Sequence, residues 1–546
     1  MHSSTRQDPS PTGAPGAPAP RILICDALAP EALEVIAGYG VQAETRTGLS
    51  EDELVAAVGE VECLLVRSAT KITRRVLEAA PRLRVVGRAG VGVDNVDLAA
   101  ASERGVLVTN APSGNTTTTA ELAIAHLCAL ARHIPRADRA VRAGQWKKKS
   151  GLMGTEIADK TLGVIGLGRI GRVVAERGRG LAMHVIAHDP FLTGHKSPVE
   201  GVELVELDAL LERSDFVSLH VPLTPETRHL LDATRLARLK HGARVINCAR
   251  GGLIDEQALL EALEEGRVRG AALDVFESEP PAPDHPLLAR EDVILTPHLG
   301  ASSDEAQRNV AIDIAREVCE FLTEGVAPNA VNAPPLSKRT RRALGPYLEL
   351  AEVLGRLLAQ RSRAPLAALE LFLSGEIAES DARHVELALL SGALGGAAAG
   401  VNFVNARSLA EARGLRLASA RDDEEHFLSS RVRVRARSAE GEWSVSGTVH
   451  GREPRLVAID GHHIDLSAHG PLLMTTHTDR PGVVGLIGTA LGNHGVNIRR
   501  VELGPPRQGE PGVAFGFFTL YDDAPQAAVD AIAALEPIRK VELLRY

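Results

Sequence analysis

The stretch TLGVIGLGRIG (161–171) decides the fold of this chain. A short apolar run leads into Gly166-x-Gly168-x-x-Gly171, and a helix is expected to follow. The first glycine permits a tight turn, the second lets the backbone approach a pyrophosphate, and the third lets the helix pack closely on the sheet. The pattern predicts a Rossmann-like nucleotide site with the pyrophosphate at a helix N-terminus.

A carboxylate, Asp189, follows Gly171 by 18 residues at the end of a second apolar strand, 184–188. There it can accept hydrogen bonds from the adenosine ribose hydroxyls, and it would repel a 2′-phosphate. NAD is therefore the expected cofactor, in preference to NADP. The alternative is a glycine-rich turn in an ordinary α/β protein, but the order of strand, loop, helix and acid favours the cofactor site.

Length and composition limit the possible classes of protein. A chain of 546 residues is too long for one core, so about three or four domains are expected. A formal net charge of −9 argues against nucleic acid or a membrane surface as partner. Five scattered cysteines and 19 histidines show no disulfide or metal-site spacing, so no metal is expected. Residues 1–20, rich in Pro, Gly and Ala, lack a signal peptide's apolar core and predict a disordered tail on a cytoplasmic protein.

Apolar strands alternate with helical stretches before the glycine loop, which predicts a separate α/β domain with a parallel sheet. The expected strands are 21–26, 64–67, 83–87 and 106–109. Helix 116–132 is apolar on nearly every side, so we expect it at a domain crossover or a subunit interface. After a second strand–helix series the chain is expected to return at Pro297 to the first domain, leaving a cleft between two lobes. Clustered Pro and Asn mark a linker at 327–337.

Three side chains suited to oxidation of a secondary alcohol follow strands of the second series: Arg250, Glu279 and His298. Because ligands of open α/β sheets bind beyond the carboxyl ends of the strands, we expect these groups to meet in the cleft. His298 can take the hydroxyl proton, and Arg250 can bind a carboxylate bidentately. Glu279 can raise the pKa of His298. Each could be structural alone, but together behind a nucleotide site they favour catalysis.

Six segments resemble the D-isomer-specific 2-hydroxyacid dehydrogenase family, and within it the long-form phosphoglycerate dehydrogenases. They are VGRAGVGVDNVDL (86–98), NAPSGNT (110–116), GLGRIG (166–171), CARGG (248–252), ALDVFESEP (272–280) and PHLGAS (297–302). The resemblance covers residues 21–546. It implies NAD-dependent oxidation of 3-phospho-D-glycerate at C2 to 3-phosphohydroxypyruvate, the first step of L-serine biosynthesis, with Arg250, Glu279 and His298 as the catalytic set.

The resemblance also implies two groups of binding residues. Those expected around the cofactor are Gly166, Gly168, Arg169, Ile170, Gly171, Asp189, Cys248, Asp274 and Gly300. Those expected around the substrate are Arg67 and Arg88 for its phosphate and the loop Ser113, Gly114 and Asn115 for its carboxylate. The lysines at 147–149, after Trp146, can add positive charge from a neighbouring subunit, and none of the three is singled out.

From residue 472 the order strand, helix, strand, strand, helix, strand predicts a ferredoxin-like sandwich. HTDRPG (477–482) and GVNI (495–498) in it resemble the ACT domain, a module that senses amino acids. The resemblance implies L-serine as effector, held by His477, Asp479 and Asn497 between paired copies, and so a homodimer or homotetramer. The alternative is that Asp479 merely caps the helix and the pocket is empty.

The resemblance implies five segments in the chain. After the tail 1–20, residues 21–112 and 297–330 form a substrate-binding domain around an NAD-binding Rossmann domain, 113–296. An intervening regulatory domain, 333–468, and an ACT domain, 470–546, follow.

Two other functions remain as hypotheses. One is a different D-2-hydroxyacid dehydrogenase that reduces 2-oxoglutarate or glyoxylate, although Arg67 and Arg88 argue against glyoxylate. The other is a non-catalytic protein that senses NAD(H), which the presence of Arg250, Glu279 and His298 and of the ACT module argues against.

Overall fold

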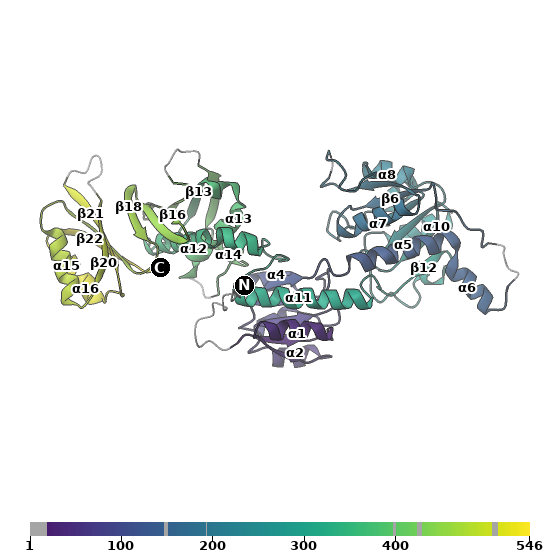
Figure 1. The fold of residues 1–546 in the computed structure, drawn as a ribbon, viewed down its shortest axis with the longest axis horizontal. Helices are drawn as coiled ribbons and strands as arrows, with labels where there is room; N and C mark the ends of the chain where they lie inside the picture. The colour runs from purple at the N-terminus through teal and green to yellow at the C-terminus, as the bar shows by residue number, and fades with distance from the viewer. Residues whose placement is uncertain (1–18, 147–150, 193, 397–399, 423–427, 505–511) are drawn as a thin grey trace, which may run out of the picture.

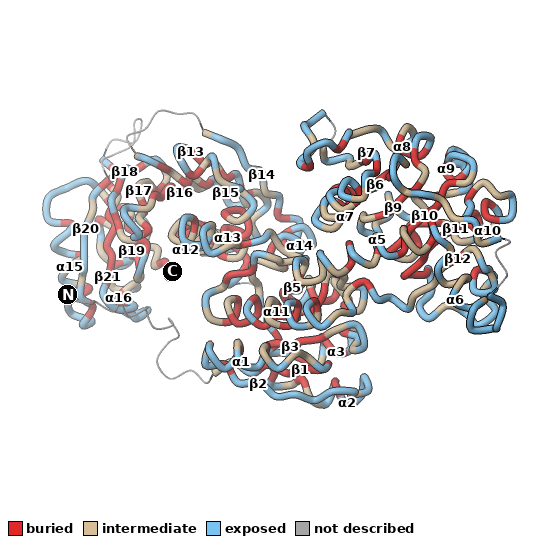
Figure 2. Tube along the Cα trace, turned by 45° about the vertical axis from the view of Figure 1, so that its right-hand side comes forward, coloured by how far each residue is buried: buried red, intermediate tan, exposed pale blue. Residues whose placement is uncertain are grey.

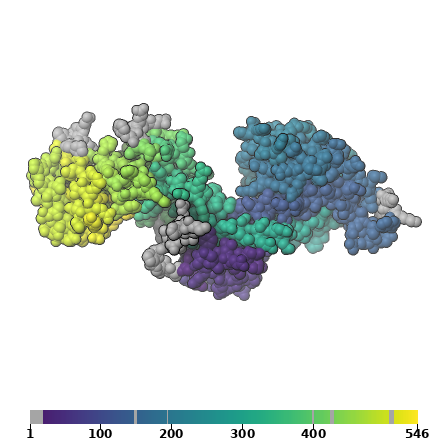
Figure 3. Space-filling model, viewed as in Figure 1, coloured from purple at the N-terminus to yellow at the C-terminus, as the bar shows by residue number. Residues whose placement is uncertain are grey.

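The computed structural model describes residues 19–146, 151–192, 194–396, 400–422, 428–504 and 512–546. Its strands form four sheets, which we use to define a first lobe, a second lobe, a third domain and a fourth domain (Figure 1). The molecule is elongated, and the fourth domain lies at the opposite end from the second lobe (Figure 3). The predicted class is confirmed: two parallel Rossmann-like sheets, a mixed sheet and an antiparallel C-terminal sheet.

The first lobe is a parallel sheet in the order β2-β1-β3-β4-β5 with helices on both faces. Its strands are β1 (Arg21–Ile24), β2 (Gln42–Thr45), β3 (Cys63–Val66), β4 (Val85–Arg88) and β5 (Leu107–Asn110). Its helices are α1 (Pro30–Gly38), α2 (Glu51–Ala57), α3 (Arg74–Glu78), α4 (Leu98–Glu103) and α11 (Asp304–Glu324). The sequence predicted four of these strands and missed β2, because its four residues are all exposed at the sheet edge and form no apolar run.

Helix α11 follows the second lobe in sequence but packs on the first sheet. A Cβ at Gly87 of β4 would lie 2.6 Å from Val318 and 3.1 Å from Ile314, both on α11. This close approach requires glycine in the strand. The chain therefore returns to the first lobe after Pro297, and the two lobes are joined by two crossings.

The second lobe is a parallel sheet in the order β12-β11-β10-β9-β6-β7-β8. Its strands are β6 (Thr161–Ile165), β7 (His184–His188), β8 (Glu203–Leu204), β9 (Phe216–Leu219), β10 (Ala243–Asn247), β11 (Val268–Leu273) and β12 (Val293–Leu295). Its helices are α5 (Thr116–Arg132), α6 (Ile134–Arg142), α7 (Arg169–Gly180), α8 (Leu207–Arg213), α9 (Ala233–Arg238), α10 (Glu256–Glu264) and the 3₁₀ helix η1 (Pro286–Ala289). The strand order reverses at β6, which places a ligand crevice at its carboxyl end. Helix α5 packs on α7, β10 and β11.

The third domain is a mixed sheet in the order β14-β13-β15-β16-β17-β18, with α12 and α13 packed together against it. Its elements are α12 (Lys338–Gln360), β13 (Ala368–Gly375), η2 (Glu376–Glu379), α13 (Ala382–Gly395), α14 (Ala406–Ala412), β14 (Arg416–Arg421), β15 (Ser430–Ser438), β16 (Gly441–His450), β17 (Glu453–Ile459) and β18 (His462–Ser467). It contacts the first lobe where Asn402 Nδ2 donates to the Gly105 carbonyl at 2.8 Å.

The fourth domain is an antiparallel sheet in the order β20-β21-β19-β22 with two helices, the predicted ferredoxin-like sandwich. Its elements are β19 (Leu472–Thr478), α15 (Val483–Asn493), β20 (Ile498–Gly504), β21 (Val513–Leu520), α16 (Gln526–Ala533) and β22 (Ile538–Leu544). The N-cap of α15 is Gly482, with φ 92°, so Asp479 does not cap this helix. In each of the four units the buried residues lie on the sheet and on the helix faces turned toward it (Figure 2).

No helix in the described part of the chain combines the length and the apolar character needed to cross a membrane. All five cysteines are free thiols. Within the described ranges no three His, Cys, Asp or Glu side chains gather in a way that could hold a metal ion.

Candidate active site

The glycine loop leaves β6 in the geometry that its sequence predicted. Gly166 has φ 90°, and a Cβ there would lie 2.6 Å from the His220 carbonyl oxygen. A Cβ at Gly171 would lie 1.9 Å from the Gly166 carbonyl oxygen, so the helix can approach the loop only with glycine. Gly168, the N-cap of α7, is exposed and faces open space. This open backbone at a helix N-terminus fits a pyrophosphate.

Asp189, directly after β7, lies across this loop. Its carboxylate accepts hydrogen bonds from the backbone N–H of Leu167 at 2.9 Å and of Phe191 at 3.0 Å. Of the neighbouring residues predicted to line the site, Arg169 is exposed and Ile170 is half-buried. A carboxylate beside the loop suits ribose hydroxyls and opposes a 2′-phosphate, so the residues present fit NAD.

His298 and Glu279 form a direct pair at the carboxyl edge of the second sheet. His298 Nδ1 lies 2.7 Å from Glu279 Oε2, with side chains 51% and 37% exposed. The hydrogen bond to Glu279 raises the pKa of His298 against the opposing effect of burial. Partial burial acts to raise the pKa of Glu279, but the hydrogen bond and charge of His298 outweigh it and lower that pKa. The pair can therefore accept and release a proton at His298.

Asp274, expected to line the cofactor site, supports the loop that carries His298. Its buried carboxylate accepts hydrogen bonds from the N–H of Leu299 at 2.7 Å, the N–H of Gly300 at 2.9 Å and the Thr296 hydroxyl at 2.6 Å. Its carbonyl accepts from the N–H of His298 at 2.9 Å. His298 itself has φ 53°, in the left-handed region that is uncommon for residues other than glycine.

Cys248, also expected beside the cofactor, is buried at the end of β10. Its Sγ lies 3.4 Å from Nδ1 of His126, a residue of α5 that is 4% exposed. Burial raises the pKa of the Cys248 thiol and lowers that of His126, so both groups are neutral. Sequence reasoning missed His126, because a lone histidine in an apolar helix has no recognisable partner spacing.

Arg250 reaches from the second lobe to the first. Its Nε lies 3.5 Å from Oδ2 of Asp94, a residue of the loop after β4 whose side chain is 76% exposed. Its Nη1 donates to the Ala249 carbonyl at 2.7 Å. The guanidinium packs against Gly92, where a Cβ would lie 2.3 Å from Nη2. Asp94 therefore occupies part of the face that Arg250 can offer to a substrate carboxylate.

Arg88, at the end of β4, brings a second positive charge to the same place. Burial, followed by the charges of Arg250 and Arg67, lowers the pKa of Arg88 to about 10. Its buried Nε has no hydrogen-bond partner. Among the described residues no carboxylate lies within ion-pair distance of Arg88 or Arg67. Three arginines thus converge where the lobes meet, and the acidic side chains whose charges act on Arg88 there are the largely exposed Asp94 and the buried Asp26.

The loop Ser113–Asn115 lies at the junction of the lobes. Ser113 is exposed, and a Cβ at Gly114 would lie 2.5 Å from Val310 of α11. Asn115 is the N-cap of α5 without a side-chain capping bond, and its buried Oδ1 has no hydrogen-bond partner. An unpaired oxygen of this kind can accept a hydrogen bond from a ligand. The lysines 147–149 lie outside the described residues.

The three expected effector residues of the fourth domain do not meet within one chain. His477 is buried on β19, where burial lowers its pKa, whereas Asp479 and Asn497 are exposed. Asp479 N–H donates to the Gly512 carbonyl at the start of β21, and the Asn497 carbonyl accepts from Tyr521 at its end. Gly512 and Tyr521, at the two ends of β21, are separated by about 30 Å at roughly 3.4 Å per residue.

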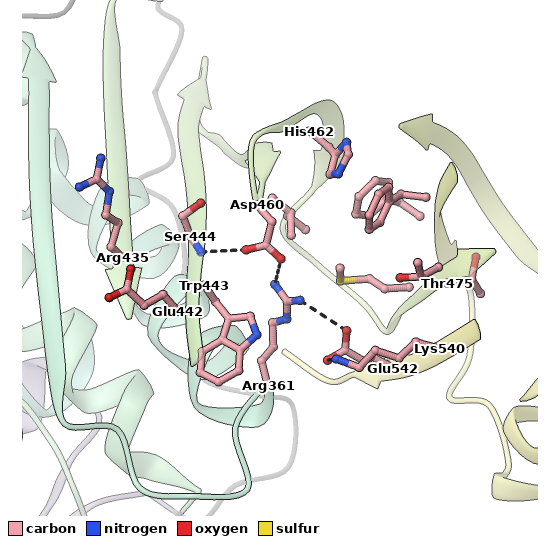
Figure 4. A pocket seen from close by; sticks show the side chains of 15 residues that line it. Arg361, Arg435, Glu442, Trp443, Ser444, Asp460, His462, Thr475, Lys540 and Glu542 are labelled. Atoms are coloured by element: carbon pink, nitrogen blue, oxygen red, sulfur yellow. Dashed lines mark hydrogen bonds and ion pairs between the residues drawn. The ribbon is translucent and has the colours of Figure 1, made fainter. Parts of the chain in front are cut away.

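Arg361, whose side chain is 6% exposed, forms ion pairs that link the third and fourth domains. Its guanidinium lies 2.5 Å from Asp460 Oδ2 in the third domain and 3.4 Å from Glu542 Oε2 in the fourth (Figure 4). Beside this bridge is a hollow of about 470 Å³ between the two domains, lined in part by Trp443 and Lys540. All of its lining residues belong to the third and fourth domains, so it is separate from the candidate site at Arg250 and His298.

Comparisons with known proteins agree with this division of the chain. Residues 124–300 match the family model of the D-isomer specific 2-hydroxyacid dehydrogenase NAD binding domain. Residues 343–460 match the D-3-phosphoglycerate dehydrogenase intervening domain, and residues 472–537 match the ACT domain. The second lobe therefore carries the NAD-binding domain of this dehydrogenase family.

Similar proteins extend over nearly the whole chain. A D-3-phosphoglycerate dehydrogenase of Methanocaldococcus jannaschii is 39% identical over 96% of this chain and 99% of its own length. One of Mycobacterium tuberculosis is 43% identical, with the same two shares. Among solved structures, a glyoxylate reductase from Paecilomyes thermophila matches 58% of this chain and 99% of its own, with 30% identity and a TM-score of 0.53.

Proposed function

The chain belongs to the D-3-phosphoglycerate dehydrogenase family, and from this premise we propose that it oxidises 3-phospho-D-glycerate at C2 to 3-phosphohydroxypyruvate with NAD. The observation that carries the choice of substrate is the convergence of Arg88, Arg67 and Arg250, of which, among the described residues, only Arg250 has a carboxylate within ion-pair distance. A ligand with a carboxylate at one end and a phosphate at the other relieves the mutual repulsion of these cations. An acid without the phosphate leaves part of the repulsion between these arginines uncompensated.

His298 serves as the acid and base of the reaction in this proposal. Because Nδ1 is hydrogen-bonded to Glu279, Nε2 is the ring nitrogen left to take the proton of the C2 hydroxyl. Glu279 stabilises the imidazolium as the proton arrives. Arg250 exchanges Asp94 for the substrate carboxylate, and the bound guanidinium draws electron density from the reacting carbon. NAD, when bound, supplies the acceptor for the hydride that leaves C2.

The cofactor residues follow from the loop geometry. We propose that the backbone at Gly166, Gly168 and Gly171 holds the pyrophosphate and that Asp189 binds the adenosine ribose. Arg169, Ile170, Cys248, Asp274 and Gly300 complete the predicted surroundings, with Cys248 and Asp274 acting from beneath the surface. Ser113, Gly114 and Asn115 are proposed to meet the substrate carboxylate.

The predicted domain boundaries are retained as part of the proposal. Residues 21–112 with 297–330 bind substrate and 113–296 bind NAD. Residues 333–468 intervene, and 470–546 form the effector domain. The separate sheets and the matched ranges support these divisions.

We further propose that L-serine is the effector and that the functional unit is a homodimer or homotetramer. The support is the distance between Asp479 and Asn497, which one chain alone does not bring together. When two copies of the fourth domain lie side by side, one copy can supply Asp479 and the other Asn497. Strand β20, which also contacts β18 of the third domain, carries exposed Val501 and Leu503. The second lobe exposes Ile134, Val141 and Trp146. Exposed apolar side chains of this kind are found at subunit contacts.

The test is NADH oxidation with 3-phosphohydroxypyruvate, 2-oxoglutarate and glyoxylate, each with and without millimolar L-serine, together with sedimentation velocity. Preferred turnover of the phosphorylated acid, inhibited by serine, supports both proposals. Preferred turnover of 2-oxoglutarate or glyoxylate replaces the substrate. NADH binding without turnover of any of the three points to the sensor hypothesis. A monomer in sedimentation contradicts the shared effector site.

A further inference from the structure

A buried chain of polar groups lies beneath the His298 loop, and the mechanism proposed above does not use it. Its centre is His126 on α5, 4% exposed and flanked by two partners far away in sequence. Nδ1 lies 3.4 Å from Cys248 Sγ, and Nε2 lies 3.3 Å from Thr296 Oγ1. The histidine thus links helix α5 to the carboxyl ends of β10 and β12.

The direction of each hydrogen bond follows from counting protons. Thr296 Oγ1 donates its single proton to Asp274 Oδ1 at 2.6 Å, so toward His126 it can only accept. His126 must therefore carry its proton on Nε2 and present a lone pair at Nδ1. The Cys248 thiol donates to that lone pair. Burial favours this arrangement, because it lowers the pKa of His126 and raises that of Cys248.

This series of hydrogen bonds ends at the backbone of the loop that carries His298. Asp274 receives the Thr296 hydroxyl and the N–H groups of Leu299 and Gly300 on its carboxylate, and the N–H of His298 on its carbonyl. The Gly300 carbonyl accepts from the Thr119 hydroxyl of α5 at 2.6 Å. A residue with φ 53° persists only where its surroundings hold it, and these bonds surround His298 on both sides.

We propose that His126 is a positioning residue for His298: through Thr296 and Asp274, its Nε2–H holds the 296–300 loop so that His298 stays on Glu279. The proposal deepens the proposed function, on which its kinetic readout rests, while its geometry stands on the hydrogen bonds alone. The competing explanation is that His126 only fills space between α5 and the second sheet.

Three substitutions separate these explanations. In His126→Gln the side-chain amide reaches the position of Nε2 and can still donate to Thr296. In His126→Asn the amide reaches only the position of Nδ1, so the donor to Thr296 is lost. His126→Leu fills the space without either bond. We expect a fall in kcat/KM of about tenfold or more for the Asn and Leu variants, and less than about threefold for Gln.

A second readout follows the pair itself rather than turnover. Oxamate, an unreactive analogue of a 2-oxo acid, is titrated into the NADH-bound enzyme from pH 5 to 9, with NADH fluorescence as signal. Its affinity falls as the His298 imidazolium loses its proton. If the loop moves His298 away from Glu279, this fall shifts to lower pH in the Asn and Leu variants and not in Gln.

The outcomes decide the inference. A pH shift in the Asn and Leu variants, restored by Gln, with NADH affinity unchanged, supports positioning by His126. An unshifted profile in all three variants overturns it, whether or not thermal stability falls. Because oxamate lacks the phosphate, the binding arm works even if the wild-type enzyme fails to turn over 3-phosphohydroxypyruvate, and so the two proposals fail separately.

Discussion

Replacing Glu279 by Gln tests the proton-transfer pair at its core. The substitution keeps the size of the side chain but removes its negative charge, which strengthens the hydrogen bond that raises the pKa of His298. The hydrogen bond from His298 Nδ1 to Glu279 Oε2 is 2.7 Å long, within the range of a charge-assisted bond. Such bonds contribute about 1.5–3 kcal/mol when well shielded from water.

Solvent reduces this contribution here, because the two side chains are 51% and 37% exposed. We therefore take about 1–2 kcal/mol for the pair. At about 1.4 kcal/mol per tenfold, Glu279→Gln lowers kcat/KM by about five- to thirtyfold at neutral pH. The reductive reaction needs the imidazolium form of His298, which is lost as pH rises through its pKa. Since Glu279 raises that pKa, the E279Q variant loses reductive activity at lower pH than the wild type.

The assay is the pH dependence of kcat/KM for NADH-driven reduction, measured for the wild type, E279Q and a matched control. Glu277→Gln serves as control, because Glu277 lies on the same loop but is hydrogen-bonded to His229 Nε2 at 2.9 Å instead. An E279Q profile that overlays the wild type refutes the assignment of the raised pKa to Glu279. An equal shift in E277Q refutes its specificity.

Four further predictions concern other charged side chains. Arg88→Met raises the KM for the phosphorylated substrate about tenfold or more, as steady-state kinetics will measure. It also raises the Tm of the ligand-free protein in calorimetry, because a buried cation without a carboxylate partner is removed. Asp94→Asn lowers the KM for 2-oxo acids by up to about fivefold, since its exposed ion pair with Arg250 contributes at most about 1 kcal/mol. Asp189→Ser lowers the preference for NADH over NADPH at least about tenfold, as the ratio of kcat/KM values shows. Arg361→Met lowers the free energy of unfolding by about 3 kcal/mol in urea, because it leaves two shielded carboxylates without the guanidinium between the third and fourth domains. An unchanged KM, cofactor ratio or urea midpoint contradicts the contact invoked in each case.

Local patterns predicted much of this fold. Helix α5 spans Thr116–Arg132, the range expected from its apolar residues, and the fourth domain has the predicted order of strands and helices. Periodicity and glycine positions report on a residue's immediate neighbours, which is why they were sufficient there. Periodicity and glycine positions were insufficient for β2, whose exposed polar residues carry no pattern. They were also insufficient for Asp479, which the sequence allowed as a helix cap, because the structure makes Gly482 the cap.

By itself the sequence determined the nucleotide loop, the strand ends that carry Arg250, Glu279 and His298, and the order of the domains. Only the tertiary structure decided which groups pair. His126 meets Cys248 across 122 positions and Thr296 across 170, and Asp94 meets Arg250 from the opposite lobe. The reason is physical: propensity and periodicity act between residues a few positions apart, whereas a hydrogen bond or ion pair forms between whichever groups the packed sheets bring within about 3 Å.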